Sequence, residues 1–322
     1  MNHAIRVHET GGPDKLVWEE VPKPGPKAGE VLIAQKAVGL NYIDVYFRTG
    51  LYKAPSMPVT IGMEGAGVVE AVGDNVTEFA VGDRVAYAGA LGAYAEARCA
   101  PAEKLVKIPD GISFEQAAAM MLQGMTAQFL VKRTYAIKPG DTILVHAAAG
   151  GVGSILVQWA KHLGATVIGV VSTPEKAALI KSLGADHALL TTDNIPAKVK
   201  EITHGAMLPV VYDSVGKDTF ITSLDCLAPR GLMITYGNAS GPVTTDLGVL
   251  AAKGSLYVTR PTLNTYTAKR EDLVATANDL FEVVTSGAVK IAVNQTYPLK
   301  DAAEAHRALE SRKTTGSTVL VP

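Results

Sequence analysis

The chain has little cysteine and no grouping of it. Only two cysteines occur, Cys99 and Cys226, and neither has another cysteine near it in the sequence. A disulfide framework or a cysteine-rich structural zinc site needs several such residues at short spacing. The sequence therefore predicts neither kind of site, and each thiol is interpreted as a buried, unreactive side chain.

The chain also lacks an excess of positive charge and a long apolar run. Lys and Arg number 30 and Asp and Glu number 31, for a formal net charge of −1. This balance offers no positive field to a nucleic-acid backbone. No stretch reaches the roughly 20 uncharged apolar residues of a membrane helix, and the first residues hold no signal-peptide core. We expect a cytoplasmic protein with no nucleic-acid and no membrane partner.

What is present indicates two domains. The 322 residues, of which 48% are hydrophobic, exceed the usual size of one domain. β-like runs at 31–34 and 67–70, with Pro- and Gly-rich segments around them, predict a mostly β or partly open barrel module at the start. From Ser113 the residues favour a helix, with Gln116 three positions on as in a capping box.

The middle of the chain alternates buried strands with helices. Apolar runs at 142–146 and 166–171 enclose a glycine turn and a helical run, which is typical of a parallel sheet covered on both faces. The remaining elements are expected as strands at 209–213, 231–236, 255–259 and 317–321, an amphipathic helix at 272–286 and a helix after Asp301.

The strongest chemical signal is the glycine turn that follows the first buried strand. The segment 148–153 reads Ala-Ala-Gly-Gly-Val-Gly, the dinucleotide fingerprint with alanine in the first position. Gly150 would let the backbone approach a pyrophosphate, and Gly153 would let the helix pack on the strand. We expect Gly150, Gly151, Val152 and Gly153 to bind a dinucleotide; the alternative is a tight turn without a ligand.

The residues after the second buried strand indicate which dinucleotide binds. An acidic residue there would bind the adenosine ribose of NAD and repel the extra phosphate of NADP. Ser172 and Thr173 stand there instead, and Lys176 follows. Hydroxyl and ammonium groups attract phosphate, so NADPH is the expected cofactor. The alternative for Lys176 is a solvated helix lysine that Glu175 partly neutralises.

Several segments, in their order and spacing, carry a resemblance to a known family. They lie at 41–46, 48–52, 82–85, 146–153, 213–216, 230–233, 236–238 and 254–261. From end to end the chain resembles the zinc-independent NADPH:quinone oxidoreductases, the zeta-crystallin-like group of the medium-chain dehydrogenase/reductase superfamily.

The resemblance implies an α/β fold of two domains. A doubly wound, parallel Rossmann sheet would be inserted into a GroES-like, mostly β catalytic domain, with the nicotinamide in the cleft between them. The implied division is 1–124 for the first part of the catalytic domain, 125–261 for the NADPH-binding domain and 262–322 for the return to the catalytic domain.

No metal site is expected. The zinc-dependent members of the superfamily have Cys at the position of Asn41 and His at the position of Met63. Asn is a poor zinc ligand and Met a weaker one. The acidic residue that remains in this segment, Glu64, is interpreted as a buried carboxylate with a structural partner.

Without a metal, hydride transfer depends on positioning, hydrogen-bond donors and exclusion of water. Quinones suit this apparatus because they are planar and electron-poor. The resemblance implies that Asn41, Tyr46 and Tyr52 face the nicotinamide and the substrate, so these are the expected catalytic residues. The alternative is a polar turn capped by aromatic packing.

The resemblance also assigns cofactor contacts along the whole chain. Besides the glycine turn, Ser172, Thr173 and Lys176, they are Tyr42, Ile43, Asp44, Val45, Tyr46, Thr126, Phe129, Thr191, Val215, Tyr236, Gly237, Asn238, Ala239, Pro261, Thr262, Leu263 and Arg312. Thr191 and Phe129 stand where close relatives have tyrosine, which puts one stacking contact and one hydrogen bond in question. Arg312 is explained equally well as a helix-terminal cation.

The expected partners are a small-molecule quinone substrate and a second copy of the chain. Family members associate through edge strands of their Rossmann sheets, and the run from Ser255 to Thr259 is apolar and rich in β-formers. Two other functions stay open. One is an NADPH-dependent reductase of α,β-unsaturated aldehydes or ketones, and the other is a non-catalytic NADPH-binding protein of a structural or RNA-associated kind.

Overall fold

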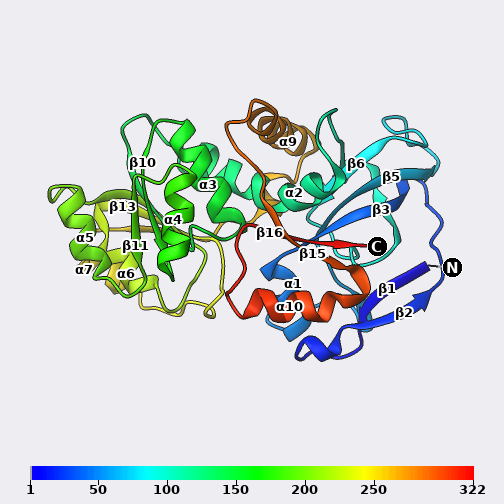
Figure 1. Cartoon of the computed structure of the whole chain (residues 1–322), viewed down its shortest axis with the longest axis horizontal. Helices are drawn as coiled ribbons and strands as arrows, with labels where there is room; N and C mark the ends of the chain where they lie inside the picture. Colours follow the sequence, from blue (N-terminus) through cyan, green and yellow to red (C-terminus); the bar gives the residue numbers. More distant parts are fainter. Residues whose placement is uncertain (1) are drawn as a thin grey trace. The chain divides into compact units, whose positions relative to one another are not determined.

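The structure of the protein is a computed structural model (Figure 1), and it is described for residues 2–322. The chain divides into two compact units. Unit 1 comprises Met1–Met125, Thr267–Thr285 and Ile291–Pro322, and unit 2 comprises Thr126–Tyr266 and Ser286–Lys290. The chain therefore begins and ends in unit 1.

Unit 1 is built on two β-sheets. The larger sheet has the strand order β15-β16-β3-β5-β6-β8, with β7 also paired to β3, and the smaller has the order β2-β1-β4. The last strand, β16, pairs with the end of β3, so the two ends of the chain share one sheet. The bounds are β1 Asn2–Val7, β2 Val17–Val21, β3 Glu30–Leu40, β4 Val59–Thr60, β5 Glu64–Val72, β6 Arg84–Ala88, β7 Ala97–Pro101, β8 Leu105–Lys107, β15 Val293–Pro298 and β16 Ser317–Val321.

The helices of unit 1 begin and end where the sequence supplies caps. In α2 (Phe114–Phe129), Ser113 and Gln116 exchange the two hydrogen bonds of the predicted capping box. The first module also contains α1 (Tyr42–Thr49), which the sequence did not predict because its eight residues include several β-formers. The other helical segments are α9 Arg270–Thr285, α10 Ala302–Glu310, η1 Pro13–Lys15, η2 Ala102–Lys104 and η4 Leu299–Asp301.

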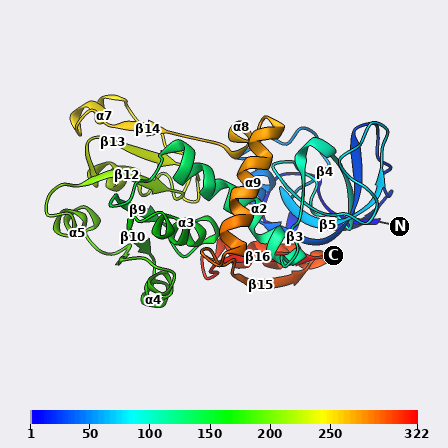
Figure 2. The ribbon, with the colours of Figure 1, turned by 90° about the horizontal axis from the view of Figure 1, so that it is seen from above.

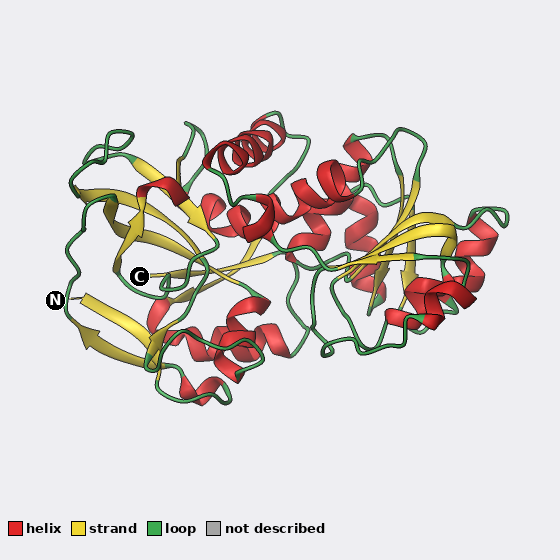
Figure 3. Cartoon of the chain, turned by 180° about the vertical axis from the view of Figure 1, so that it is seen from behind, coloured by secondary structure: helices red, strands yellow, loops and turns green. Residues whose placement is uncertain are grey.

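Unit 2 is a parallel sheet with the strand order β11-β10-β9-β12-β13-β14. The order runs outward from β9 in both directions, as a doubly wound sheet requires. Figure 2 shows β10, β9, β12, β13 and β14 side by side in this order, and Figure 3 shows helices on both sides of the sheet. The predicted α/β fold is confirmed.

The strands and helices of unit 2 alternate along the chain. The strands are β9 Thr142–His146, β10 Thr166–Val171, β11 His187–Leu190, β12 Leu208–Asp213, β13 Leu227–Thr235 and β14 Tyr257–Thr259. The helices are η3 Leu130–Thr134, α3 Gly151–His162, α4 Pro174–Ser182, α5 Ile195–Ile202, α6 Phe220–Asp225, α7 Gly248–Ala252 and α8 Leu263–Tyr266. Leu144, Val211 and Met233 are fully buried in the core beside the sheet. Among residues 2–322, every helix is too short or too polar to cross a membrane.

Candidate functional site

The carboxyl edge of the unit 2 sheet gathers most of the predicted cofactor residues. All six parallel strands end at this edge, where open α/β sheets bind their ligands. The predicted residues here are Gly150, Gly151, Val152 and Gly153 after β9, Ser172, Thr173 and Lys176 after β10, Thr191 after β11, Val215 after β12, Tyr236, Gly237, Asn238 and Ala239 after β13, and Pro261, Thr262 and Leu263 after β14.

Two further predicted residues of unit 2, Thr126 and Phe129, lie in the last turns of α2. The Phe129 ring stacks on Tyr266, with 4.4 Å between the ring centroids and 12° between the planes. Phe129 is thereby held beside α8, the helix that begins at Leu263.

The glycine turn joins β9 to α3. Gly150 is the N-cap residue of α3. A Cβ atom on Gly153 would lie 2.4 Å from the carbonyl oxygen of Ala147, so only glycine lets the helix approach the strand this closely. A Cβ atom on Gly150 would meet its nearest neighbour at 3.2 Å and needs only a small shift. Packing therefore requires glycine at position 153 much more strictly than at position 150.

Ser172, Thr173 and Lys176 form a polar rim at the start of α4. Thr173 is the N-cap residue, and its hydroxyl accepts a hydrogen bond from the backbone N–H of Lys176 at 3.3 Å. The rim therefore combines the positive end of a helix dipole with an ammonium group, and both of these attract an anion. Partial burial lowers the pKa of Lys176.

Asp213, the last residue of β12, organises the loop that follows it. Its buried carboxylate accepts hydrogen bonds from the backbone N–H groups of Val215 at 2.8 Å and Gly216 at 3.1 Å. It also accepts from the hydroxyls of Thr219 and Ser223, both at 2.7 Å. These four donors compensate the buried charge and hold the Val215 backbone at the carboxyl edge.

Two buried polar atoms on the last residues of the unit 2 strands have no hydrogen-bond partner within residues 2–322. They are Nε2 of His146, the last residue of β9, and Oγ1 of Thr235, the last residue of β13. Burial lowers the pKa of His146, although the nearby Asp213 opposes this. Unpartnered buried polar groups are rare in folded proteins, so the pair fits an edge that receives a hydrogen-bonding ligand such as a dinucleotide.

In unit 1, α1 and the turn that follows it contribute a cluster of tyrosines. The rings of Tyr46 and Tyr52 meet edge to face with 5.1 Å between their centroids, and Tyr42 lies 6.4 Å from Tyr46. The Tyr42 hydroxyl donates to the carbonyl oxygen of Leu309 at 3.3 Å. Burial raises the pKa of Tyr42, and the positive charge of Arg312 opposes this rise. Unit 1 thus brings Tyr42, Tyr46, Tyr52 and Arg312 together.

Asp44 starts α1 instead of presenting its carboxylate to solvent. The side chain is fully buried and accepts from the Asn41 backbone N–H at 2.9 Å and from the Tyr94 hydroxyl at 3.1 Å. Burial raises the pKa of Asp44 to about 7. Val45 is also buried, and Ile43 is half-buried. A cofactor contact at Asp44 would therefore have to use its backbone.

Asn41 lies in a chain of buried hydrogen bonds. Its Nδ2 donates to Glu64 at 2.8 Å, and its Oδ1 accepts from Gln123 at 3.0 Å. Glu64 also accepts from the backbone N–H of Leu122 in α2. Burial raises the pKa of Glu64 to about 8. The interpretation of Glu64 as a buried carboxylate with structural partners is confirmed.

A second network ties α1 to α10. Arg48 donates to both carboxylate oxygens of Glu310, at 2.8 and 2.9 Å, and to Nδ1 of His306 at 3.0 Å. Burial and the charge of Arg48 lower the pKa of His306 to about 3, so its ring is neutral. The Nε2–H group of His306 then donates to the Tyr94 hydroxyl, with 3.0 Å between nitrogen and oxygen, and the Tyr94 hydroxyl in turn donates to Asp44.

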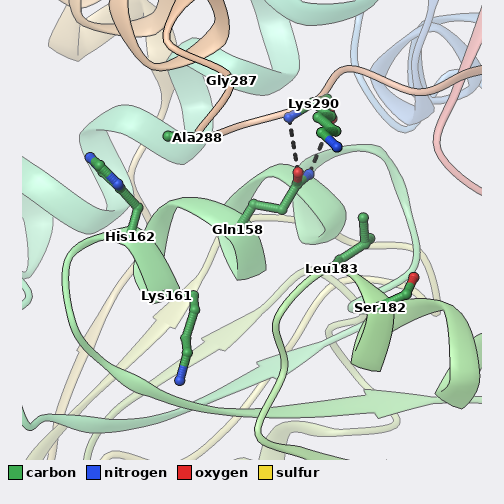
Figure 4. A pocket seen from close by; sticks show the side chains of 8 residues that line it. All are labelled: Gln158, Lys161, His162, Ser182, Leu183, Gly287, Ala288 and Lys290. Atoms are coloured by element: carbon green, nitrogen blue, oxygen red, sulfur yellow. Dashed lines mark hydrogen bonds between the residues drawn. The ribbon is translucent and has the colours of Figure 1, made fainter.

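A hollow of about 310 Å³ in unit 2 lies away from the carboxyl edge (Figure 4). Its lining residues are Gln158, Lys161, His162, Ser182, Leu183, Gly287, Ala288 and Lys290. They include the last turns of α3 and α4, opposite the glycine turn, and the Gln158 amide bonds the Lys290 backbone at 3.1 and 2.9 Å. Gln158 therefore anchors a loop here, and the hollow is not the predicted cofactor site.

Comparison with known proteins gives the family. The family model described as "Zinc-binding dehydrogenase" matches residues 151–279, and "Alcohol dehydrogenase GroES-like domain" matches residues 27–110. A quinone oxidoreductase of Pseudomonas aeruginosa is 55% identical over 100% of both chains. The chain belongs to the quinone oxidoreductases. The resemblance predicted from the sequence, including its GroES-like module, is confirmed.

Two further relatives bear on cofactor and substrate. The crystal structure of the Escherichia coli quinone oxidoreductase complexed with NADPH has a TM-score of 0.98, 49% identity, and coverage of 99% of this chain and 100% of that chain. A 2-haloacrylate reductase of a Burkholderia species is 46% identical over 99% of this chain and 98% of its own.

One matched family model is described as zinc-binding, which raises the question of whether this chain has a group of side chains that could bind zinc. Within the part of the chain that the structure describes, no three side chains of His, Cys, Asp or Glu gather as metal ligands would. The absence of a metal in the working protein stays a prediction.

Sequence reasoning missed the polar residues behind Asn41 and α1. Gln123 lies 82 residues from Asn41, and Ser317 lies 194 residues from Gln123. No spacing within a motif links positions this far apart. Paired changes at these positions in related sequences would have been the signal.

Proposed function

We propose that the protein transfers a hydride from NADPH to a quinone without using a metal. The observation that carries this proposal is its similarity, over the full length, to quinone oxidoreductases, one of which was solved with NADPH. The polar rim and the unpartnered buried atoms at the carboxyl edge of unit 2 support the choice of cofactor.

In this proposal the residues at the carboxyl edge bind NADPH. The turn from Gly150 to Gly153 and the N-terminus of α3 hold the pyrophosphate, and the rim of Ser172, Thr173 and Lys176 holds the additional phosphate. The other predicted cofactor residues of both units keep the contacts inferred from the family. The proposed division into 1–124, 125–261 and 262–322 follows from the same assignment.

Asn41, Tyr46 and Tyr52 orient the quinone. The tyrosines offer aromatic faces and phenolic donors, and the Asn41 amide offers an N–H to a carbonyl oxygen on which negative charge develops. Bound NADPH supplies the hydride, and a proton from solvent completes the hydroquinone. The acidity of a hydroquinone leaves little work for a general acid, so positioning dominates.

The test is a comparison of acceptors. Purified, chelator-treated protein is mixed with NADPH and, in separate assays, with benzoquinone, phenanthrenequinone, an enone and a haloacrylate, and NADPH oxidation is followed by absorbance. We expect turnover with the quinones and a preference for NADPH over NADH. Turnover with the enone or haloacrylate alone would favour the second candidate, a reductase of activated alkenes, which the 46% identical haloacrylate reductase supports.

We also propose a cytoplasmic homodimer. In β14, the edge strand of the unit 2 sheet, Tyr257 is 60% exposed and Val258 is 36% exposed. A second copy pairing along this edge would cover both side chains and the open strand. Sedimentation of the wild type and of Val258→Lys tests this: we expect a dimer and a monomer, respectively, and a monomeric wild type would contradict it.

A further inference from the structure

The Asn41 amide is held by side chains from three other elements of unit 1. Glu64 is the first residue of β5, Gln123 lies in α2, and Ser317 is the first residue of β16. All four side chains are at least 94% buried. Asn41 itself is the N-cap residue of α1 and directly precedes the tyrosine cluster.

The hydrogen bonds of this group run in one direction. The Ser317 hydroxyl lies 2.7 Å from Gln123 Oε1, Gln123 Nε2 donates to Asn41 Oδ1 at 3.0 Å, and Asn41 Nδ2 donates to Glu64 at 2.8 Å. An ionised Glu64 can only accept, and the Leu122 N–H occupies its other oxygen. The carboxylate therefore determines which way the Asn41 amide faces.

This arrangement leaves one hydrogen of the amide for another molecule. Asn41 Nδ2 makes a single hydrogen bond among residues 2–322, to Glu64, and its second N–H remains. If the amide were turned by 180°, Oδ1 and Nδ2 would exchange places within the amide plane, and the carbonyl oxygen would stand where the second N–H had been.

We propose that Glu64, with Gln123 behind it, is a positioning residue that aims the second N–H of Asn41 at the oxygen of the bound substrate. The inference rests on the proposed function, because it needs a substrate oxygen that gains negative charge. A preorganised donor of this kind lowers the barrier without itself reacting.

Exchanging the side chains of Glu64 and Gln123 separates the effect of the Asn41 amide orientation from the effect on protein stability. In Glu64→Gln, the new amide can accept from Leu122 or from Asn41 but not from both. In Gln123→Glu, Asn41 Oδ1 loses its donor. In the double variant, the amide at 64 accepts from Leu122 and donates to Asn41 Oδ1, while the carboxylate at 123 accepts from Asn41 and Ser317. The hydrogen bonds that link positions 64, 41 and 123 are restored, but the Asn41 amide is reversed.

We expect both single variants to lose stability and turnover, and the double variant to recover its unfolding midpoint while kcat stays about a hundredfold low. The dissociation constant for NADPH and the KM for benzoquinone should change little in the double variant. The control is Gln116→Glu, which changes the same residue type in the exposed first turn of α2. Recovery of kcat together with stability would overturn the inference and leave the network a structural role only.

The pH profile gives a second readout, which stands even if the exchanged pair does not fold. A protonated Glu64 can donate as well as accept, so the direction of the chain is enforced only above its pKa, which burial raises to about 8. The other titratable groups around it are Asp44, Tyr87 and Tyr94. We expect kcat of the wild type to rise through this range and the rise to vanish in Glu64→Gln.

A flat wild-type profile, or the same rise in Glu64→Gln, would overturn the inference. These outcomes differ from a failure of the proposed function. That failure would appear first, as a wild-type protein that does not reduce quinones. In that case the same variants would be compared with the enone, whose carbonyl oxygen also gains charge on reduction.

Discussion

Two glycines of one turn have different roles at the scale of single residues. A methyl group on Gly153 would collide with the Ala147 carbonyl, whereas one on Gly150 would be nearly accommodated. We expect Gly153→Ala to lower the free energy of unfolding by about 1–3 kcal/mol, as overpacking does. Gly150→Ala should leave stability nearly unchanged and weaken NADPH binding. Denaturant titration and NADPH fluorescence measure the two effects.

The two glycine variants serve as controls for each other. If Gly150→Ala destabilised the protein as much as Gly153→Ala, the separation of packing from ligand approach would be wrong. If Gly150→Ala bound NADPH as tightly as the wild type, the pyrophosphate would not lie against Gly150.

Lys176 tests the choice of NADPH at the same scale. Replacement by Ala removes the ammonium group beside Ser172 and Thr173, and a lost charge-assisted hydrogen bond to phosphate costs about 1–3 kcal/mol. We expect Lys176→Ala to weaken NADPH binding by that amount and NADH binding far less, as measured by calorimetry. Equal weakening of both would contradict the assignment. Lys181→Ala, in the last turn of α4, is the matched control.

At the scale of elements, α1 and α10 are joined by an ion pair between a buried arginine and a partly exposed glutamate. Arg48 is 1% exposed and forms two hydrogen bonds with Glu310. Arg48→Met leaves the buried Nδ1 of His306 and the partly exposed Glu310 carboxylate without their donor, so it should lower the free energy of unfolding by about 1–3 kcal/mol. Arg6→Met, which removes a partly exposed pair with Glu19, should cost less than about 1 kcal/mol. Similar values for both variants would show that burial does not strengthen the Arg48 pair.

The buried carboxylate on β5 makes stability depend on pH. Burial raises the pKa of Glu64 from its ordinary value near 4.5 to about 8. Between these values the folded protein keeps a proton that the unfolded chain has released, so the free energy of unfolding falls as pH rises. The fall attributable to Glu64 should approach about 1.4 kcal/mol per pH unit and be absent in Glu64→Gln.

The comparison with Glu64→Gln isolates this effect. The neutral His306 acts in the opposite direction below its ordinary pKa of 6.5, because the unfolded chain then binds a proton that the folded protein excludes. Both proteins share that contribution, so it cancels in the difference. Denaturant titrations across the range that give parallel curves would show that Glu64 is ionised in the folded protein throughout.

At the scale of the whole molecule, sequence periodicity predicts helices and strands well but predicts buried polar networks poorly. The strands at 142–146 and 166–171 have the bounds expected from the sequence, because a strand buried on both faces is an uninterrupted apolar run. The helix α1 was not predicted because its residues favour strands. A capping contact between Asn41 and Asp44 nevertheless starts it as a helix.

The candidate site likewise has a part that the sequence predicts and a part that it does not. The glycine turn and the polar rim are local patterns, so the sequence could predict them. The chain from Ser317 through Gln123 and Asn41 to Glu64 forms only when four distant segments fold together. Its members are ordinary residues in their own segments, and nothing local marks them.

The central claim is direct hydride transfer from NADPH to a quinone. The most direct test is a single-turnover experiment in which chelator-treated protein, loaded with NADPH, is mixed rapidly with benzoquinone, once with ordinary NADPH and once with deuterium at the transferred position. We expect the bound NADPH to be oxidised in one step that deuterium slows severalfold. Bound NADPH that survives the quinone, or an oxidation that requires added metal or is insensitive to deuterium, would contradict the claim.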